Sequence, residues 1–542
     1  EANLAKTGTG ILVLTNGGNS FEGNITVTGG GLAVSSDEAL GHLSNEVHLA
    51  GGTLHLADME LYHDIVLEGF GAISVTGTAF VQWEVSGTGT LLKTGLGTLW
   101  LSTSNSFLGD VVIEAGTLHI SDDHVLGDAS NQVILAGGQL EIDYDITTDR
   151  DIILDGTLVP TSGISVTHEF EYLVRGSLSG TGNLVKTGSG RLLLEGPVNY
   201  SGHLQVSEGS VVFRSDTSLL TGQIINHGEL VFEQSVNSSF GNVISGSGSL
   251  IQNGTALLDL TAATLAYSGN TVVNSGTLAT GNIANSSLIL NGGAFSPGGD
   301  GSISNITVQG LEVRAGVFRF DLGYLGAGDR ITVFDGAAAL TGSAHFVFST
   351  DANIGVFPLI IGLDGAWDLS LLSFEGIGAP DAHLFLNSNQ TTLYLSLQGE
   401  PITGSILQNS DPVNTPRDAI FLVSGPVTTG TPEEDNEIGL LYFEGDSSLQ
   451  VYNHLTVHSG TLSVISGTGY LYGDVLVTPG DLTIEGNGQL VTDIDFQVGG
   501  NTLVTSGTFV ANGQVSGSDV IVQPGAALGG SGAHAGAGVG AG

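Results

Sequence analysis

The chain contains a stretch that it repeats twice, and this stretch decides the fold: Leu4-Ala5-Lys6-Thr7-Gly8-Thr9-Gly10-Ile11-Leu12-Val13-Leu14. The same pattern returns at 91–101 and at 184–194. Its three lysines, Lys6, Lys93 and Lys186, stand 87 and 93 residues apart. A weaker copy at 248–260 has Gln252 where the others have lysine. A motif that recurs at this scale indicates a repeat protein rather than one globular core.

Two further blocks follow each copy in a fixed order. The first places an aromatic residue beside a glycine turn, at 19–23, 105–109 and 199–202. The second is a short strand that begins at or just after a glycine, at 31–34, 116–120 and 209–213. Apolar and polar residues alternate within the blocks, which is the period of a half-buried strand. Strands this short cannot bury their apolar face alone, so we expect successive coils to stack as a β-solenoid.

The composition favours an all-β chain. The 542 residues include 85 glycines, and 41% are hydrophobic, which is enough to fill a core. Thr, Val, Ile, Leu, Ser and Gly dominate, and these residues suit strands and turns. There is no cysteine, so stability must come from packing and backbone hydrogen bonds.

The charge balance is strongly acidic, with 54 acidic and 11 basic residues and a net charge of −43. Such a chain repels nucleic acid and anionic lipid, so we predict neither as a partner. The charge favours solubility outside a cell, and the alternative is binding of cations or of basic surfaces. No apolar run approaches the ~20 residues of a membrane helix, so we predict that this segment does not span a membrane.

The chain divides into four regions that differ in composition and in the length of the expected strands. Residues 1–300 carry the short repeats, and 301–399 hold longer, more apolar strands that we expect to continue or cap the solenoid as a wider, sandwich-like region. Residues 400–437 are Pro-rich and acidic, which is typical of an insertion or linker. Residues 438–542 return to short alternations and end in a Gly/Ala-rich tail, which predicts a second solenoid-like segment.

The Lys-Thr-Gly-x-Gly units with their two downstream blocks resemble the passenger-associated transport repeat of bacterial autotransporters. The resemblance covers roughly residues 1–280, and Ser296-Pro297-Gly298-Gly299 followed by 328–333 is similar to the region after those repeats. It implies a right-handed parallel β-helix, export to the bacterial surface, and a role in adhesion, aggregation or scaffolding.

The candidate chemical residues have structural interpretations. We expect Lys6, Lys93 and Lys186 to lie along the solenoid with their ammonium groups near carboxylates. Asp149-Arg150-Asp151 has the ingredients of a sugar site, but a solvated turn with a local ion pair is the simpler interpretation. The segment 121–127 contains Asp122, Asp123 and His124, yet it aligns with 36–41, which has no histidine and so indicates a repeat turn.

Metal sites are weakly indicated. The acidic run Glu433-Glu434-Asp435-Asn436-Glu437 offers oxygen ligands for calcium but lacks the spacing of an EF-hand. His48, His55 and His63 are better explained as surface polar residues than as zinc ligands. We therefore assign no catalytic, cofactor-binding or metal-ligating residue, and calcium is the one cofactor left open.

The sequence predicts a non-enzymatic extracellular rod that acts by adhesion or self-association at the bacterial surface. Its expected partners are further copies of itself or host and surface glycans and proteins. A subunit of a self-assembling fibre or sheath is the first alternative, joined end to end by strand addition. A carbohydrate-active enzyme on a β-helix is the second, and converging carboxylates in a cleft would favour it.

Overall fold

The computed structural model describes residues 3–323 except 158–160, and residues 328–397 except 336, 351–355, 366, 379–381 and 387–389. From residue 420 on it describes the strands, most of them as backbone only. The Pro-rich segment 400–437 and the Gly/Ala-rich tail fall largely outside the described residues. The chain forms two compact units, residues 1–295 and 296–542.

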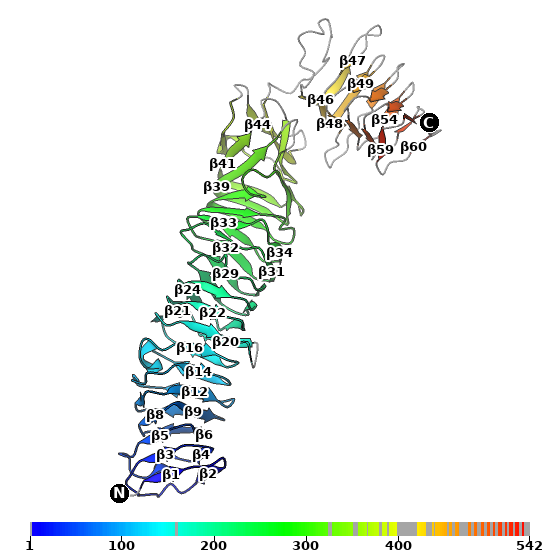
Figure 1. Ribbon diagram of the computed structural model, residues 1–542. Helices are drawn as coiled ribbons and strands as arrows, with labels where there is room; N and C mark the ends of the chain where they lie inside the picture. Colours follow the sequence, from blue (N-terminus) through cyan, green and yellow to red (C-terminus); the bar gives the residue numbers. More distant parts are fainter. Residues whose placement is uncertain are drawn as a thin grey trace. The chain divides into compact units, whose positions relative to one another are not determined.

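Unit 1 is built of parallel sheets whose strands come from successive coils of the chain (Figure 1). Sheet A contains β1 (Leu4–Lys6), β3 (Ile25–Val27), β5 (Val47–Leu49), β8 (Ile65–Leu67) and β11 (Val85–Gly87). Sheet B contains β2 (Ile11–Leu14), β4 (Gly31–Val34), β6 (Thr53–Leu56), β9 (Phe70–Val75), β12 (Thr90–Thr94), β14 (Val111–Ile113), β16 (Val133–Leu135), β19 (Ile152–Leu154), β22 (Leu178–Gly180) and β25 (Val198–Tyr200).

Two further sheets complete the unit. Sheet C contains β7 (Met59–Leu61), β10 (Thr78–Val81), β13 (Thr98–Leu101), β15 (Thr117–Ile120), β17 (Gln139–Ile142), β20 (Thr161–Val166), β23 (Asn183–Thr187), β26 (Leu204–Val206), β28 (Ile224–Asn226), β31 (Val243–Gly246) and β34 (Thr264–Tyr267). Sheet D contains β18 (Ile146–Thr148), β21 (Glu171–Val174), β24 (Arg191–Leu194), β27 (Ser210–Phe213), β29 (Glu229–Phe232), β32 (Ser249–Gln252), β35 (Thr271–Val273), β37 (Leu288–Pro297), β36 (Thr277–Thr280), β33 (Leu257–Leu260) and β30 (Ser238–Ser239).

The pairing confirms the predicted all-β solenoid with parallel stacked coils. Strands pair with their equivalents one coil away, as where β10 pairs with β13, and the later coils contribute two strands each to sheet D, as with β29 and β30. Short 3-10 turns, η1 (Asp37–Leu40) and η2 (Asp123–Leu126), are the helical elements in the described part of unit 1. Among all described residues, no helix is long and apolar enough to cross a membrane.

The core lies inside the coils. Alternate strand residues point inward, and in sheet B the inward column includes Val111, Val133, Ile152 and Leu178, each at most 1% exposed. Burying one such side chain contributes roughly 1.5–3 kcal/mol. Because every coil adds similar residues to the same columns, the apolar core continues along the whole stack.

The repeats do not stack directly above one another. Lys6 lies in sheet A, Lys93 in sheet B, Lys186 in sheet C, and Gln252 of the weaker copy in sheet D. Each repeat therefore begins on a different face of the coil from the one before. The sequence period alone does not reveal this rotation.

The repeat lysines are buried, which corrects the expectation that their ammonium groups meet carboxylates. Lys93 is 0% exposed, and its Nζ donates to the carbonyl oxygens of Thr94, Gly95 and Ala115, each at 2.9 Å. Lys6 and Lys186 make the same three kinds of contact, two to their own Thr-Gly turn and one to the next coil. Since a buried carbonyl without a donor is costly, the lysine serves as an internal clamp between two turns.

The turn glycines allow this close stacking. Gly116 is the first residue of the segment 116–120 that follows the second lysine motif. Its φ of 65° is a left-handed conformation that favours glycine. A Cβ on Gly116 would collide with the carbonyl oxygens of Gly95 and Gly97 in the neighbouring turn. The turn of the lysine motif, at Gly95 and Gly97, therefore packs directly against Gly116 of the following coil.

Unit 2 begins with longer strands. Its first sheet has the order β38 (Asn305–Val308), β40 (Arg330–Val333), β42 (Val356–Ile361), β45 (Thr392–Ser396) and β44 (His383–Leu386), and the last two pairings are antiparallel. Beside it β39 (Leu311–Leu322) pairs with β41 (Ala338–Thr350), which pairs with β43 (Leu372–Glu375), preceded by the turn η4 (Leu369–Leu371). Phenylalanines of β39 and β41 stack at their centre, with Phe318 and Phe346 5.1 Å apart between ring centroids.

The later strands of unit 2 form three parallel sheets. The first contains β46 (Ile420–Thr429), β48 (Leu440–Val451), β51 (Val475–Val477), β54 (Phe496–Val498), β57 (Val515–Ser516) and β60 (His534–Ala535). The second contains β47 (Asn436–Glu437), β49 (Leu455–Val457), β52 (Leu482–Ile484), β55 (Thr502–Val504) and β58 (Val520–Val522), and the third contains β50 (Thr461–Val464), β53 (Gln489–Thr492), β56 (Thr508–Ala511) and β59 (Ala527–Gly529).

The lysine clamp can be tested by substitution. Lys93→Met keeps the apolar stem but removes the buried ammonium that donates to three carbonyls of half-buried turns, so we expect a loss of about 2–4 kcal/mol in the free energy of unfolding. Lys93→Gln should cost about half as much, because Gln252 donates Nε2 to the carbonyls of Gly254 and Ala256 at the equivalent position. Urea unfolding measures both; equal midpoints for Lys93→Met and the native chain would contradict the clamp.

The clamp also predicts a pH dependence. Burial lowers the pKa of Lys93 and of Lys186 to about 8. Unfolded lysines titrate near 10.4, so between these values the unfolded chain binds more protons than the folded chain, and stability rises with pH. The variant carrying Lys93→Gln and Lys186→Gln should therefore gain less stability than the native chain between pH 8 and 10. Parallel urea midpoints for the two proteins across that range would refute the assignment.

Candidate ligand-binding face

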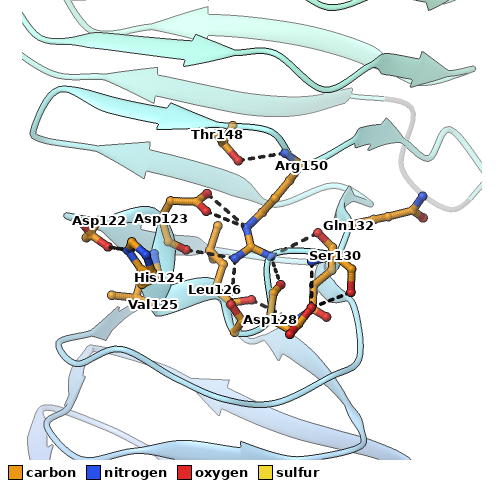
Figure 2. A network of polar contacts seen from close by, with 12 residues as sticks. Asp122, Asp123, His124, Val125, Leu126, Asp128, Ser130, Gln132, Thr148 and Arg150 are labelled. Atoms are coloured by element: carbon orange, nitrogen blue, oxygen red, sulfur yellow. Dashed lines mark hydrogen bonds and ion pairs between the residues drawn. The ribbon is translucent and has the colours of Figure 1, made fainter.

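Two of the residue groups singled out in the sequence meet in one buried network, shown in Figure 2. Arg150 follows β18 and is 3% exposed. Its Nε donates to both carboxylate oxygens of Asp123, at 3.1 and 3.2 Å. Its Nη2 donates to the carbonyl of Gly127 at 2.8 Å, and its Nη1 donates to the carbonyls of Asp128 and Asn131. The guanidinium therefore closes the end of η2 from another coil.

This network corrects the interpretation of Asp149-Arg150-Asp151 as a solvated turn with a local ion pair. Arg150 is buried, and its carboxylate partner lies 27 residues earlier in the chain. Asp151 accepts hydrogen bonds from the backbone and hydroxyl of Ser177, at 2.7 and 2.8 Å, and these bonds lower its pKa. Arg150 and Asp151 are thus used for contacts between coils.

The segment 121–127 forms a 3-10 turn that has an equivalent in the first repeat. The carboxylate of Asp122 accepts from the backbone N–H of His124 at 2.8 Å and lies 2.6 Å from its Nδ1. The equivalent residues of the first repeat form η1, which has the same 3-10 conformation without a histidine. The common backbone explains the conserved pattern of this turn within the chain.

The three candidate histidines have different surroundings. His48 lies between Glu68 and Glu46, at 2.8 and 3.0 Å; burial opposes its charge, but the hydrogen bonds with these two carboxylates raise its pKa. His63 is 0% exposed, which contradicts its interpretation as a surface residue, and it bonds to Asp37 at 2.9 Å. Burial lowers the pKa of His55.

An outward column on sheet C is the most distinctive surface feature. We define it as the residues Glu60, Phe80, Trp100, His119 and Glu141, which are register partners on β7, β10, β13, β15 and β17. The ring centroids of Phe80 and Trp100 are 5.3 Å apart, and those of Trp100 and His119 are 3.2 Å apart in a stacked arrangement. Phe80 and Trp100 are half-buried, so their rings remain partly open to solvent.

A second line of polar residues runs beside this column. Thr78, Thr98, Thr117 and Gln139 occupy the other outward position of the same strands and are register partners in turn. Hydroxyl and amide groups both donate and accept hydrogen bonds. The face thus presents aromatic rings next to a row of small polar groups.

Carboxylates stand at both ends of the outward column. At the far end, His119 Nε2 lies 3.2 Å from Asp143 and 3.9 Å from Glu141, and His119 is 2% exposed. Burial lowers the pKa of His119, although both carboxylates act to raise it. At the near end, Glu60 is exposed and accepts a hydrogen bond from the hydroxyl of Tyr62. The ends of the column are therefore acidic and its centre is aromatic.

More aromatic surface lies beyond the acidic end. Tyr144, next in sequence to Asp143, is 56% exposed and stacks on Phe170 with ring centroids 5.5 Å apart. His168 lies 5.9 Å from Phe170, edge to face. Aromatic side chains of this kind supply much of the binding energy at protein interfaces.

Our sequence interpretation did not include this column, although a signal for it exists. Phe80, Trp100, His119 and Glu141 each occupy the third position of a four-residue strand. Alternation places that position outward. Aligning the strands coil by coil, rather than repeat by repeat, would have brought these residues into one column.

The described residues contain no group of three or more histidine and acidic side chains arranged to hold a metal ion. The side chains of Glu433–Glu437, where calcium was left open, lie outside the described residues. Calcium at that segment stays a prediction.

Comparison with known proteins follows the same repeats. The passenger-associated-transport-repeat family matches residues 4–34, 91–120, 184–213 and 250–279, the last being the copy with Gln252. The chain therefore contains four copies of a repeat that is found in autotransporter passenger domains. Its repeats indicate a location outside the cell or on the bacterial outer-membrane surface.

Two curated relatives are similar to part of this chain. The adhesin BmaC autotransporter of Brucella suis is 32% identical over 194 residues, which is 35% of this chain and 5% of the relative. The uncharacterized lipoprotein YdeK of Escherichia coli is 27% identical over 291 residues, which is 52% of this chain and 20% of the relative. The chain thus matches only a small part of each relative's length, and no solved structure matches significantly.

The Arg150 network predicts a local loss of stability. Arg150→Met leaves several buried carbonyls and the half-buried Asp123 without their partner, so we expect a loss of about 2–4 kcal/mol in the free energy of unfolding. Arg314→Met is the matched control, because Arg314 pairs with Glu312 at 2.7 Å on an exposed surface and such pairs contribute about 1 kcal/mol or less. Thermal unfolding followed by circular dichroism measures both; equal effects would show that Arg150 is not a buried anchor.

Proposed function

We propose that the chain is an adhesive passenger that binds its partners along the side of its β-helix rather than transforming them chemically. The observation that carries the proposal is the outward column on sheet C, where Phe80 and Trp100 stay partly open to solvent in register on adjacent strands. Interfaces depend on aromatic side chains of this type, held on a rigid support.

The comparisons with known proteins also support an adhesive role. One relative is named an adhesin, and it shares 32% identity with this chain over 194 residues. A solenoid also presents its outward columns on many coils, which suits contact with large or repetitive partners. The net charge of −43 keeps copies of the chain apart, which disfavours the alternative of side-by-side self-association at low salt.

Binding rather than catalysis is also favoured by the way the carboxylates are used. Asp123 binds Arg150, Asp151 binds Ser177, and Asp143 lies against His119. In the described residues these acids serve contacts between coils, whereas a glycoside hydrolase needs two carboxyl groups that face one scissile bond.

A binding panel tests the proposal. The purified full chain is passed over immobilised neutral glycans, sialylated glycans, acidic proteins, basic proteins and the chain itself, with biolayer interferometry as the readout. We expect saturable binding to at least one glycan or protein surface, with weakening in a Trp100→Ala variant that keeps the native melting temperature.

Two outcomes would overturn the adhesive role. Binding to the chain alone, with filaments visible by electron microscopy, would make the fibre subunit the correct function. Release of new reducing ends from a polysaccharide would make the chain a carbohydrate-active enzyme.

A further inference from the structure

We propose that the corner between sheets C and D binds a neutral pyranose ring of a glycan, which lies on the open face of Tyr144 and is hydrogen-bonded by His168 and Glu169. We call Tyr144, His168, Glu169 and Phe170 the corner cluster. This inference rests on the proposed adhesive function and adds a second contact site with a stated ligand class. It is drawn from a turn that is longer than its neighbours and holds aromatic and polar side chains together.

The first step is the length of this turn. The segment 142–146 spans the corner in one coil, and its register partner in the next coil, 166–172, takes six steps where the first takes four. In the coil after that, the corner 187–192 takes five steps where its partner segment 165–172 takes seven. The turn 167–170 thus carries two extra residues compared with both neighbouring coils. Insertions of this kind in repeat proteins often lie on the binding face.

The second step is the fixed backbone of the turn. The N–H of Thr167 donates to the carbonyl of Ile142 at 2.9 Å, and the hydroxyl of Ser189 donates to the carbonyl of His168 at 2.8 Å. His168 has a φ of 51° and is one of two non-glycine residues with positive φ in the described part of the chain. Such conformations are uncommon for residues with a Cβ, and they gather at ligand sites. The turn therefore presents its side chains in a fixed arrangement.

The third step is the open ring face of Tyr144. One face of this ring stacks on Phe170, with centroids 5.5 Å apart, and in the described part of the chain Phe170 is its one ring contact. Tyr144 is nevertheless 56% exposed. The second face and the hydroxyl edge are therefore open to solvent. Trp100 differs in this respect, because Phe80 and His119 lie against its ring.

The fourth step is the set of polar groups beside this face. His168 and Glu169 are exposed, and the ring of His168 lies edge to face with Phe170 at 5.9 Å. The Tyr144 hydroxyl and the imidazole each donate and accept hydrogen bonds, and the carboxylate accepts them. A pyranose ring matches this set, since its hydroxyls also donate and accept. The C–H groups on its apolar face suit the negative face of an aromatic ring.

The surrounding acids determine which glycans are excluded. Asp145 accepts from the N–H of Glu171 at 2.9 Å, Asp143 lies 3.2 Å from His119, and Glu171 pairs with Arg191. Because these carboxylates already have partners in the fold, the open groups of the corner cluster select the ligand. The negative charge of the corner disfavours sialylated and sulfated glycans. A neutral sugar is therefore the expected occupant.

The test is saturation-transfer NMR with the full chain and four named sugars. Cellotriose, lactose and triacetylchitotriose are the neutral probes, and sialyllactose is the anionic one. We expect transfer to at least one neutral probe, strongest at the axial C–H protons of one ring face, because that face lies on Tyr144. We expect no transfer to sialyllactose, because like charges repel. A titration with the neutral probe that gives the strongest signal measures the affinity.

Variants locate the site. Tyr144→Ala should weaken binding by about tenfold, whereas Tyr144→Phe keeps the ring and should cost about threefold. His168→Asn should cost about three- to fivefold, since asparagine adopts the same left-handed backbone but lacks the imidazole. The matched control is Phe70→Ala, because Phe70 is a 69% exposed aromatic of sheet B. It should change the affinity by less than about twofold. Circular dichroism and the melting temperature show that each variant is folded.

Three outcomes would overturn the inference, and they separate it from the proposed function. Native affinity in Tyr144→Ala, with loss in Trp100→Ala, would place the sugar on the outward column and leave the adhesive function standing. Absence of transfer to every neutral probe, with binding to a protein surface of the panel, would keep the adhesive function and replace the ligand class. Absence of binding to the sugars and to every surface of the panel would refute both the inference and the adhesive function.

Discussion

The buried backbone carbonyls of the turns are the constraint on which the rest of this structure depends. Within each sheet the ladder of parallel strands satisfies the backbone, but at the corners of the coil the ladder stops and carbonyls face the interior. A buried carbonyl without a donor is costly. Side chains supply the donors: the lysines of the repeats, Arg150, and the equivalent asparagines Asn45 and Asn131.

The asparagines show how general this solution is. Asn45 donates to the carbonyls of Phe21 and Leu40, and Asn131 donates to those of Phe107 and Leu126. These are equivalent places in the first and second repeats. In the first two repeats the sequence unit thus supplies a lysine as donor for one turn and an asparagine as donor for another.

The sequence was sufficient to predict the solenoid, because alternation, glycine turns and ordered repeats are local signals that all require stacked coils. It was not sufficient to predict that the lysines of the repeats are buried. Lys93 reads as a polar residue that should reach solvent, and only the register with Ile113 shows that it points inward. Arg150 was misread for a similar reason, since its partner Asp123 lies 27 residues away.

The outward column was missed because repeat and coil have different periods. The repeats recur after 87 and 93 residues, whereas Phe80 and Trp100 are aligned by a coil of 20 residues. Each repeat begins on a new face, so comparing repeats places unlike faces side by side. The two periods together determine which residues share a surface, and only the strand register provides the second.

The position of the few basic residues then determines the character of the surface. A lysine that must serve three carbonyls cannot also balance exposed acids, and Lys93 is 0% exposed. The arginines of sheet D stand opposite glutamates one coil away, as Arg214 does with Glu233 at 3.0 Å. These basic residues thus bind turn carbonyls inside the coils or carboxylates of neighbouring coils. The acids of the outward column, Glu60 and Glu141, have no lysine or arginine in that column. Because the basic residues serve contacts inside and between the coils, sheet C keeps an outward face of carboxylates and aromatic rings.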